Sequence, residues 1–286
     1  MNGENPDSGL WLRDQFVFLS ASKPSRNPER FPLVADRMNG TSVEIEEAVV
    51  SLARAVFSRG GRLVFGGHPS ISPLVASVAA EYFPAGEIED GMEPVWIFQS
   101  RAFEKVIPKT TTRLKDLGYA RIFWTESVDE EQFQPKDAGQ EQCLNSLRAM
   151  RQAMIDLCPP GENSKLAPNR KPIAMVAIGG MEGVVREARL FLEQTAGGVY
   201  ALRSTAGAAS RLFEYLKENF PAEPAEISAY RWDRRISYLE EIFPFKAQPR
   251  REIDRDLPLA SYAILMQMLV MRIAQRDLSS PGNFPA

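Results

Sequence analysis

The chain has 286 residues, of which 44% are hydrophobic and 25% charged, and this ordinary globular composition excludes a largely disordered protein. Its formal net charge of −3 creates no overall attraction for nucleic acid, so no nucleic-acid partner is expected. With one histidine, and two cysteines that lack zinc-site spacing, the sequence predicts no metal site and no cofactor.

The N-terminal segment and the most apolar run of the chain bear on its location. Residues 1–14 are predicted to form a polar tail, and its segment from Met1 to Gly9 is polar and acidic and lacks the basic and apolar regions of a secretory signal. The most apolar run, Tyr262 to Met271, is shorter than the roughly 20 residues that span a bilayer. We therefore expect a cytoplasmic protein without a membrane partner.

Short apolar runs alternate with helical patterns along most of the chain. Strands are predicted at about residues 15–20, 62–65, 94–98, 120–124, 172–178 and 199–202. Helices are predicted at about residues 41–59, from 73 onward, around 113–114, at 141–157 and at 184–195. The first helix is expected to begin at Thr41, because Glu44 then takes the capping-box position. This alternation is typical of an α/β, Rossmann-like fold, a mostly parallel sheet with helices on both faces.

The pattern is less regular after about residue 215. It indicates a strand near 225–230, a short helix near 235–242 and an apolar C-terminal helix that contains Tyr262 and Met266. Such a helix either packs on the sheet of its own chain or is buried against a second subunit. We thus predict a tail at 1–14, a ligand-binding domain at 15–215 and an extension at 216–286 that packs on this domain or forms an interface.

Three glycine-containing corners, each directly after a predicted strand, are the strongest functional signal. They run from Phe65 to Pro69, from Ile178 to Gly183 and from Arg203 to Ala208. Paired glycines let backbone amides approach an anion, and the helix that follows adds its positive end. Any single corner fits a tight turn equally well, whereas three at one sheet edge favour a ligand cleft. The predicted ligand-binding residues are Ser20, Ser22, Gly66, Gly67, His68, Ser70, Gly179, Gly180, Met181, Glu182, Gly183, Ser204, Thr205 and Gly207.

Polar and charged side chains near the corners each have two interpretations. Glu187 lies one helical turn after the second corner. There it either binds a ribose hydroxyl and stabilises positive charge on the sugar, or is a solvated glutamate in the first turns of the helix. Arg148 and Arg151 share a helix face and either hold a phosphate or form a solvated basic surface. His68 is an acid or base near neutral pH, or a hydrogen-bonding loop residue. Ser204 contacts a phosphate or caps the next helix.

Taken in order, these segments resemble the SLOG superfamily, which joins the Smf/DNA-processing proteins, the LONELY GUY phosphoribohydrolases and the ligand-sensing domains of TRPM channels. The resemblance covers roughly residues 15–215 and implies a Rossmann-like fold that binds nucleotides or nucleotide-derived molecules. Bacterial relatives are thought to sense nucleotide signals in conflict and anti-phage systems. The segments that carry the resemblance are Leu19 to Ser22, Val64 to Pro69, Arg148 to Met154, Gly179 to Gly183 with Glu187, and Ser204 to Gly207.

The LONELY GUY branch of this superfamily cleaves the N-glycosidic bond of nucleoside 5′-monophosphates and carries the motif PGGxGTxxE with an upstream arginine. The residues that match here are Gly179, Gly180, Gly183 and Glu187, with Arg148 or Arg151 as the arginine. Ile178 replaces the proline, one extra residue precedes Gly183, and Val184 replaces the threonine that would contact phosphate. These departures weaken the case for hydrolysis more than the case for binding.

We therefore expect a sensor of a nucleotide-derived small molecule that acts through homo-oligomerisation or an effector protein. The alternative is a hydrolase of N-glycosidic bonds in nucleoside 5′-monophosphates, with Glu187, Arg148 and Arg151 as catalytic residues. The acidic composition disfavours DNA binding in the manner of the Smf proteins. Neither GxxxxGK[ST] nor a compact GxGxxG occurs, which argues against an ATPase or a dinucleotide-dependent dehydrogenase.

Overall fold

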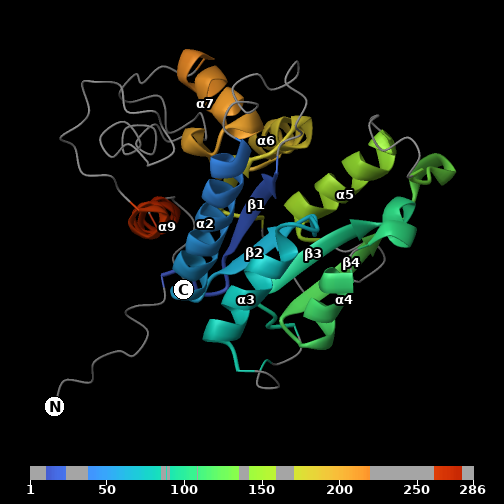
Figure 1. Cartoon of the computed structure of the whole chain (residues 1–286), viewed down its shortest axis with the longest axis horizontal. Coiled ribbons are helices and arrows are strands. Elements are labelled where there is room, and N and C mark those ends of the chain that lie inside the picture. The colour runs from blue at the N-terminus through green and yellow to red at the C-terminus, as the bar shows by residue number, and fades with distance from the viewer. Residues whose placement is uncertain are drawn as a thin grey trace.

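The computed structural model describes residues 11–23, 38–84, 88, 91–107, 109–134, 142–158, 171–219 and 261–278. Six parallel strands form one sheet in the order β4-β3-β2-β1-β5-β6, which confirms the predicted α/β fold with a parallel sheet (Figure 1). The strands are β1 (Phe16–Ser22), β2 (Arg62–Phe65), β3 (Val95–Ser100), β4 (Ala120–Thr125), β5 (Ala174–Gly179) and β6 (Gly198–Leu202).

Helices connect the strands, as parallel pairing requires. They are α2 (Met38–Phe57), α3 (Ser72–Tyr82), α4 (Lys109–Asp116), α5 (Leu144–Asp156), α6 (Glu182–Gln194), α7 (Gly207–Asn219) and α9 (Tyr262–Leu278), with short 3₁₀ segments η1 (Arg101–Val106), η2 (Val128–Glu130) and η4 (Arg203–Thr205). The predicted start at Thr41 is wrong, because α2 begins one turn earlier and Thr41 lies inside it, where an N-cap cannot form. The patterns at 225–230 and 235–242 lie outside the described residues.

Each face of the sheet is covered by its own set of helices. Val17 and Leu19 of β1 belong to one core cluster and Phe16 and Phe18 to the other, because successive side chains of a strand point to opposite faces. The first cluster includes buried residues of α2, α3, α4 and α9, and the second includes residues of α5, α6 and α7. Helices therefore lie on both faces, as the sequence predicts.

The C-terminal helix α9 packs beside α2 (Figure 1). Its buried side chains include Tyr262, Met266 and Val270, all of which belong to the core cluster that α2 also lines. Ile264 lies on another side of the helix and is 58% exposed. Among the described helices, none combines the length and the apolar character needed to cross a bilayer.

Candidate functional site

The sheet changes its direction of growth between β1 and β5. After β1 the chain adds β2, β3 and β4 on one side, then returns to place β5 and β6 on the other. Ligands of open parallel sheets bind outside the carboxyl ends of the strands at such a switch point. Ser22 at the end of β1 is aligned with Gly179 at the end of β5. The three corners follow β2, β5 and β6, so they lie at this same edge.

Three of the predicted site residues meet near the second corner, and each comes from a different element. Ser20 of β1 donates its hydroxyl to Oε2 of Glu187 on α6. Nε of Arg151 on α5 donates to Oε1 of the same carboxylate over 3.2 Å. The side chains of Arg151 and Glu187 are only 10% and 16% exposed, so this ion pair is largely removed from water. A charge in that position needs partners, and each carboxylate oxygen has one.

The guanidinium of Arg151 also reaches the start of α6. A Cβ built on Gly183 would lie 3.2 Å from Nη2 of Arg151, so the missing side chain leaves room for this close approach. The first turn of a helix carries amides without intrahelical partners and a positive end of the helix dipole. Arg151 thus places a guanidinium, which also pairs with Glu187, beside the positive end of the α6 dipole, an arrangement in which an anion is favoured.

The second corner itself requires glycine at two consecutive positions. Gly179 has φ +60° and Gly180 has φ +81°, and a Cβ on Gly180 would lie 2.2 Å from Cγ2 of Val184. The Gly180 amide donates to the carbonyl of Ser22 over 2.7 Å. The Gly179 amide donates to Oγ1 of Thr205 over 2.8 Å. Because these two amides already have acceptors within the chain, they are not free to bind an anion.

The third corner supports the second. Thr205 is fully buried, and besides accepting from Gly179 its hydroxyl donates to the carbonyl of Leu202 over 2.7 Å. The amide of Ala208 donates to the carbonyl of Gly180 over 2.9 Å. The hydroxyl of Thr205, which the sequence predicts to contact a phosphate, is therefore already used in hydrogen bonds that hold the second and third corners together.

Ser204, the neighbouring predicted residue, faces the C-terminal helix. Its hydroxyl accepts a hydrogen bond of 2.9 Å from Oη of Tyr262 on α9, and both side chains are buried. No local pattern in the sequence links these two residues, because α9 lies far along the chain from the corner.

The first corner is shaped by a residue that the sequence analysis missed. Gln99 of β3 is buried and donates from Nε2 to the carbonyl of Gly66 over 2.7 Å. Gly67 has φ +65°, and a Cβ there would come within 2.2 Å of the same Nε2. On the other side, Gly66 faces the Cε of Met150 on α5. The available signal was the amide side chain of Gln99 directly after the apolar run from Val95 to Phe98.

His68 takes part in a local hydrogen-bonded turn. Its Nδ1 lies 2.9 Å from the hydroxyl of Ser70 and accepts from the Ser70 amide over 3.3 Å. Burial lowers the pKa of His68, and the positive charge of Lys23 lowers it further. A lower pKa favours the neutral imidazole, and Lys23 is itself paired with Glu46 on α2. The geometry supports the loop interpretation of this histidine more directly than an acid or base role.

The remaining predicted residues stand at the starts of helices. Met181 has an extended backbone immediately before α6, and Glu182 is the first residue of that helix. Gly207 opens α7 with φ +61°. These positions place all three at the edge where the other corners lie.

Arg148 does not join the cluster of Ser20, Arg151 and Glu187. It is exposed, and among the described residues it forms neither a hydrogen bond nor an ion pair. It lines a cavity of about 480 Å³ together with Arg151 of α5 and Arg186 and Arg189 of α6. The last two were missed by the sequence analysis, although they repeat the three-residue spacing of Arg148 and Arg151.

Comparisons with known proteins agree with the motifs. No match was found among curated proteins. The model of the SLOG cluster3 family matches residues 37–232, which is more than half of the chain and contains all three corners as well as Arg151 and Glu187. The chain therefore belongs to the SLOG cluster3 family.

Proposed function

We propose that this protein binds a nucleotide-derived small molecule at the carboxyl edge of the sheet and acts as its sensor. The observation that carries the proposal is the largely buried cluster of Ser20, Arg151 and Glu187 beside the second glycine corner. Membership of a SLOG family supports a nucleotide-related ligand. Buried charges at a switch point are typical of ligand sites.

The cluster offers complementary groups for the two ends of a nucleotide. Nη2 of Arg151 faces the start of α6, where a phosphate would meet both a guanidinium and the positive end of the helix dipole. The carboxylate of Glu187 is an acceptor for a ribose hydroxyl. We therefore place the phosphate at Arg151 and α6, and the sugar at Glu187.

Binding without turnover is favoured by the residue that follows Gly183. Val184 stands where the resemblance implies a threonine, and its side chain is buried with Cγ2 close to Gly180. It provides no hydroxyl for a phosphate. A ligand held without that contact fits a sensor better than an enzyme that must position a scissile bond.

Hydrolysis of an N-glycosidic bond is the second candidate, and the placement of Glu187 favours it. A carboxylate that is shielded from water stabilises positive charge on a sugar during cleavage. In that reaction water attacks C1′, the bond between C1′ and the base nitrogen breaks, and the base leaves with a proton. Arg151 would then hold Glu187 in position.

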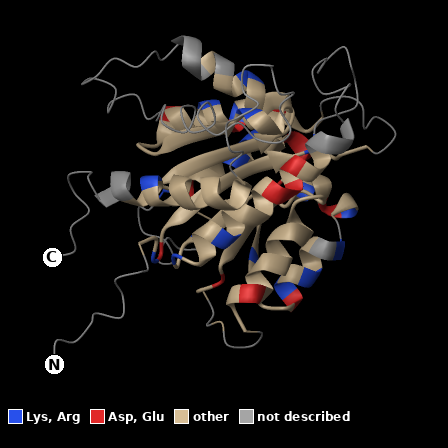
Figure 2. Ribbon diagram, turned by 60° about the vertical axis from the view of Figure 1, so that its left-hand side comes forward, with Lys and Arg blue, Asp and Glu red and all other residues tan. Residues whose placement is uncertain are grey.

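We further propose that ligand occupancy is passed on through self-association or an effector protein, in a cytoplasmic defence or signalling system of bacteria. The family resemblance is the support for this context. In Figure 2 the basic and acidic residues are scattered over a ribbon that is mostly tan, and blue and red occur near one another, which provides no support for a DNA-binding face among the described residues.

A panel of mononucleotides, cyclic nucleotides and ADP-ribose-like compounds tests the proposal. Thermal shift and release of free base are recorded in the same samples for the wild type, Glu187→Gln and the control Glu47→Gln on the exposed side of α2. A ligand at 100 times its Kd stabilises the folded state by about 2.7 kcal/mol. We expect a bound compound to stabilise the wild type and the Glu47→Gln control by this amount. Glu187→Gln should bind the same compound at least tenfold more weakly, and none of the three proteins should release free base.

Each other result has a definite meaning. Base release that disappears in Glu187→Gln but persists in Glu47→Gln would replace the sensor by the hydrolase. The absence of a shift with every compound, or equal shifts in all three proteins, would contradict ligand binding at Glu187.

A further inference from the structure

Two arginines of α5 and two arginines of α6 line the same cavity between these helices. Arg148 and Arg151 of α5 and Arg186 and Arg189 of α6 line the cavity of about 480 Å³, and we call this feature the arginine groove. Leu144 and Leu190 supply apolar parts of its wall.

The arginine groove carries more positive than negative charge. Glu193 is the carboxylate among its lining residues, and Nε of Arg189 already donates to it over 2.9 Å. Glu187 is held by Arg151 and Ser20. Arg148 has no hydrogen bond or ion pair with any part of the chain that the structure describes. A protein with a net charge of −3 therefore concentrates cations here.

This concentration has a cost in the free protein. Within each helix the two arginines are three residues apart, a spacing at which like charges repel. An anion with several negative charges would pair with the guanidinium of Arg148 and add a further partner for Arg151 and Arg189, which already contact Glu187 and Glu193. Guanidinium groups match phosphate oxygens in geometry.

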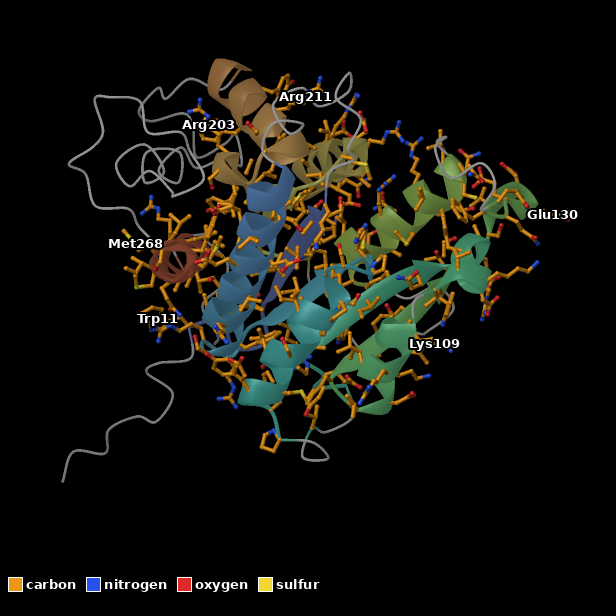
Figure 3. All side chains as sticks on the ribbon, in the orientation of Figure 1. Trp11, Lys109, Glu130, Arg203, Arg211 and Met268 are labelled. Carbon is orange, nitrogen blue, oxygen red and sulfur yellow. The ribbon has the colours of Figure 1, made fainter. Side chains whose placement is uncertain are left out.

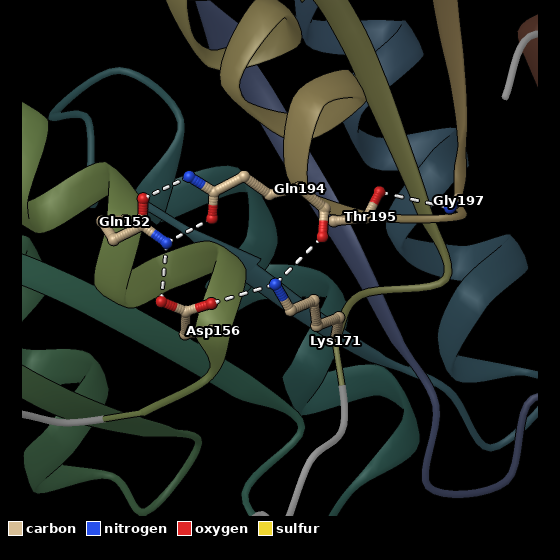
Figure 4. A network of polar contacts seen from close by, with 6 residues as sticks. All are labelled: Gln152, Asp156, Lys171, Gln194, Thr195 and Gly197. Atoms are coloured by element: carbon tan, nitrogen blue, oxygen red, sulfur yellow. Dashed lines mark hydrogen bonds and ion pairs between the residues drawn. The ribbon is translucent and has the colours of Figure 1, made fainter. Parts of the chain in front are cut away.

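The walls of the arginine groove are held at a set distance. Figure 4 shows that Gln152 of α5 and Gln194 of α6 exchange hydrogen bonds through their amides. Lys171 joins the two helices a second time, because its Nζ binds Asp156 of α5 over 3.2 Å and the carbonyl of Gln194 over 2.9 Å. The arginine groove is thus preformed, which lowers the entropic cost of binding.

We propose that the arginine groove binds a phosphate chain, so that the ligand of this protein carries at least two linked phosphate groups. The identity of that ligand as a nucleotide rests on the proposed function. Arg151 connects the two regions, since it contacts Glu187 at the strand ends and also lines the arginine groove. One phosphate lies at Arg151, and the next lies between Arg148 and α6.

Calorimetric titration of the whole protein with inorganic pyrophosphate and with orthophosphate tests this directly. The variants are Arg148→Gln, which removes a side chain without partners among the described residues, and the charge-matched control Lys109→Gln. Lys109 is on α4, a helix that contributes to the core on the opposite face of the sheet (Figure 3). We expect pyrophosphate to bind at least tenfold more tightly than orthophosphate, Arg148→Gln to weaken pyrophosphate at least tenfold, and the control to match the wild type.

Two results would overturn the inference. If pyrophosphate and orthophosphate bind with equal affinity, the arginine groove does not select linked phosphate groups. If Arg148→Gln and Lys109→Gln lose the same amount of pyrophosphate affinity, binding responds to net charge alone. Raising the salt concentration should weaken the specific binding as well, because guanidinium–phosphate contacts are screened.

Titration with AMP and ADP separates this inference from the proposed function. If ADP binds more tightly than AMP and only that gain is lost in Arg148→Gln, the phosphate chain belongs to a nucleotide. If AMP and ADP bind with equal affinity, and this affinity falls in Glu187→Gln but is unchanged in Arg148→Gln, the inference fails while the proposed function stands. If pyrophosphate binding depends on Arg148 but neither nucleotide binds, the arginine groove serves a free polyphosphate and the nucleotide proposal fails instead.

Discussion

At the residue scale, the second corner shows two separate reasons why a position admits only glycine. One is a positive φ, which a Cβ makes unfavourable, and the other is a neighbouring atom in the space that the Cβ would fill. Gly180 combines both, since its φ is +81° and Cγ2 of Val184 lies 2.2 Å from the point that a Cβ would occupy. Gly118 has φ +76° but nothing within 4 Å, so it isolates the first reason.

Gly118→Ala and Gly180→Ala should therefore differ in stability. The positive φ costs each variant about 1–2 kcal/mol. Gly180→Ala should lose about 1–3 kcal/mol more, because the methyl group overpacks the corner. The free energy of unfolding in urea measures both losses. Equal losses would mean that the corner relaxes freely around the added carbon and that crowding does not fix its shape.

At the element scale, a hydrogen bond within the described part of the chain connects α9 to the site edge. Tyr262 donates to Ser204, the next residue Thr205 holds the Gly179 amide, and Ala208 holds the Gly180 carbonyl. This series of contacts runs from the C-terminal helix to the second corner. We therefore expect the position of α9 to be coupled to the backbone that borders the proposed ligand.

Tyr262→Phe tests this connection. Loss of the buried hydrogen bond leaves the Ser204 hydroxyl without this donor, and a loss of about 1–3 kcal/mol is typical of such a change. We expect lower stability and faster hydrogen exchange of the α9 amides. In the control Tyr82→Phe, at a side chain that is 39% exposed, stability should change by less than about 0.5 kcal/mol. Identical exchange of α9 in both variants would contradict the coupling.

At the scale of the whole molecule, His68 is expected to make stability depend on pH just below neutrality. An unfolded histidine titrates near pH 6.5. In the folded protein, burial and then Lys23 lower the pKa of His68. As the pH falls below about 6.5, the unfolded chain binds this proton before the folded chain does, so the free energy of unfolding decreases.

Urea unfolding at pH 7.5 and pH 6.0 measures this effect. The wild type should lose stability over this interval, and His68→Asn should lose clearly less, because asparagine retains an acceptor for the Ser70 amide but does not titrate. The chain has no other histidine that could mask the difference. A slope that is the same in both proteins would show that His68 keeps an ordinary pKa in the fold.

The elements of the sheet were predictable because their signals are local. Each strand follows from a short apolar run, and both faces of β1 are apolar because helices cover both. The exact ends were less predictable, as the start of α2 shows, since a helix can extend beyond its best capping residue. The boundaries of the predicted segments at 1–14, 15–215 and 216–286 stay predictions.

The sequence by itself determined the fold class, the family and the three corners, because periodicity, glycine pairs and their order along the chain are local properties. Only the tertiary structure decided which side chains meet. Ser20 and Glu187 are 167 positions apart, yet share a hydrogen bond. Arg148 and Arg151 look equivalent in the sequence, but α5 packs with one face on the sheet, so Arg151 is buried against Glu187 while Arg148 stays exposed. Which of the two arginines is buried depends on long-range packing, and no local sequence pattern encodes it.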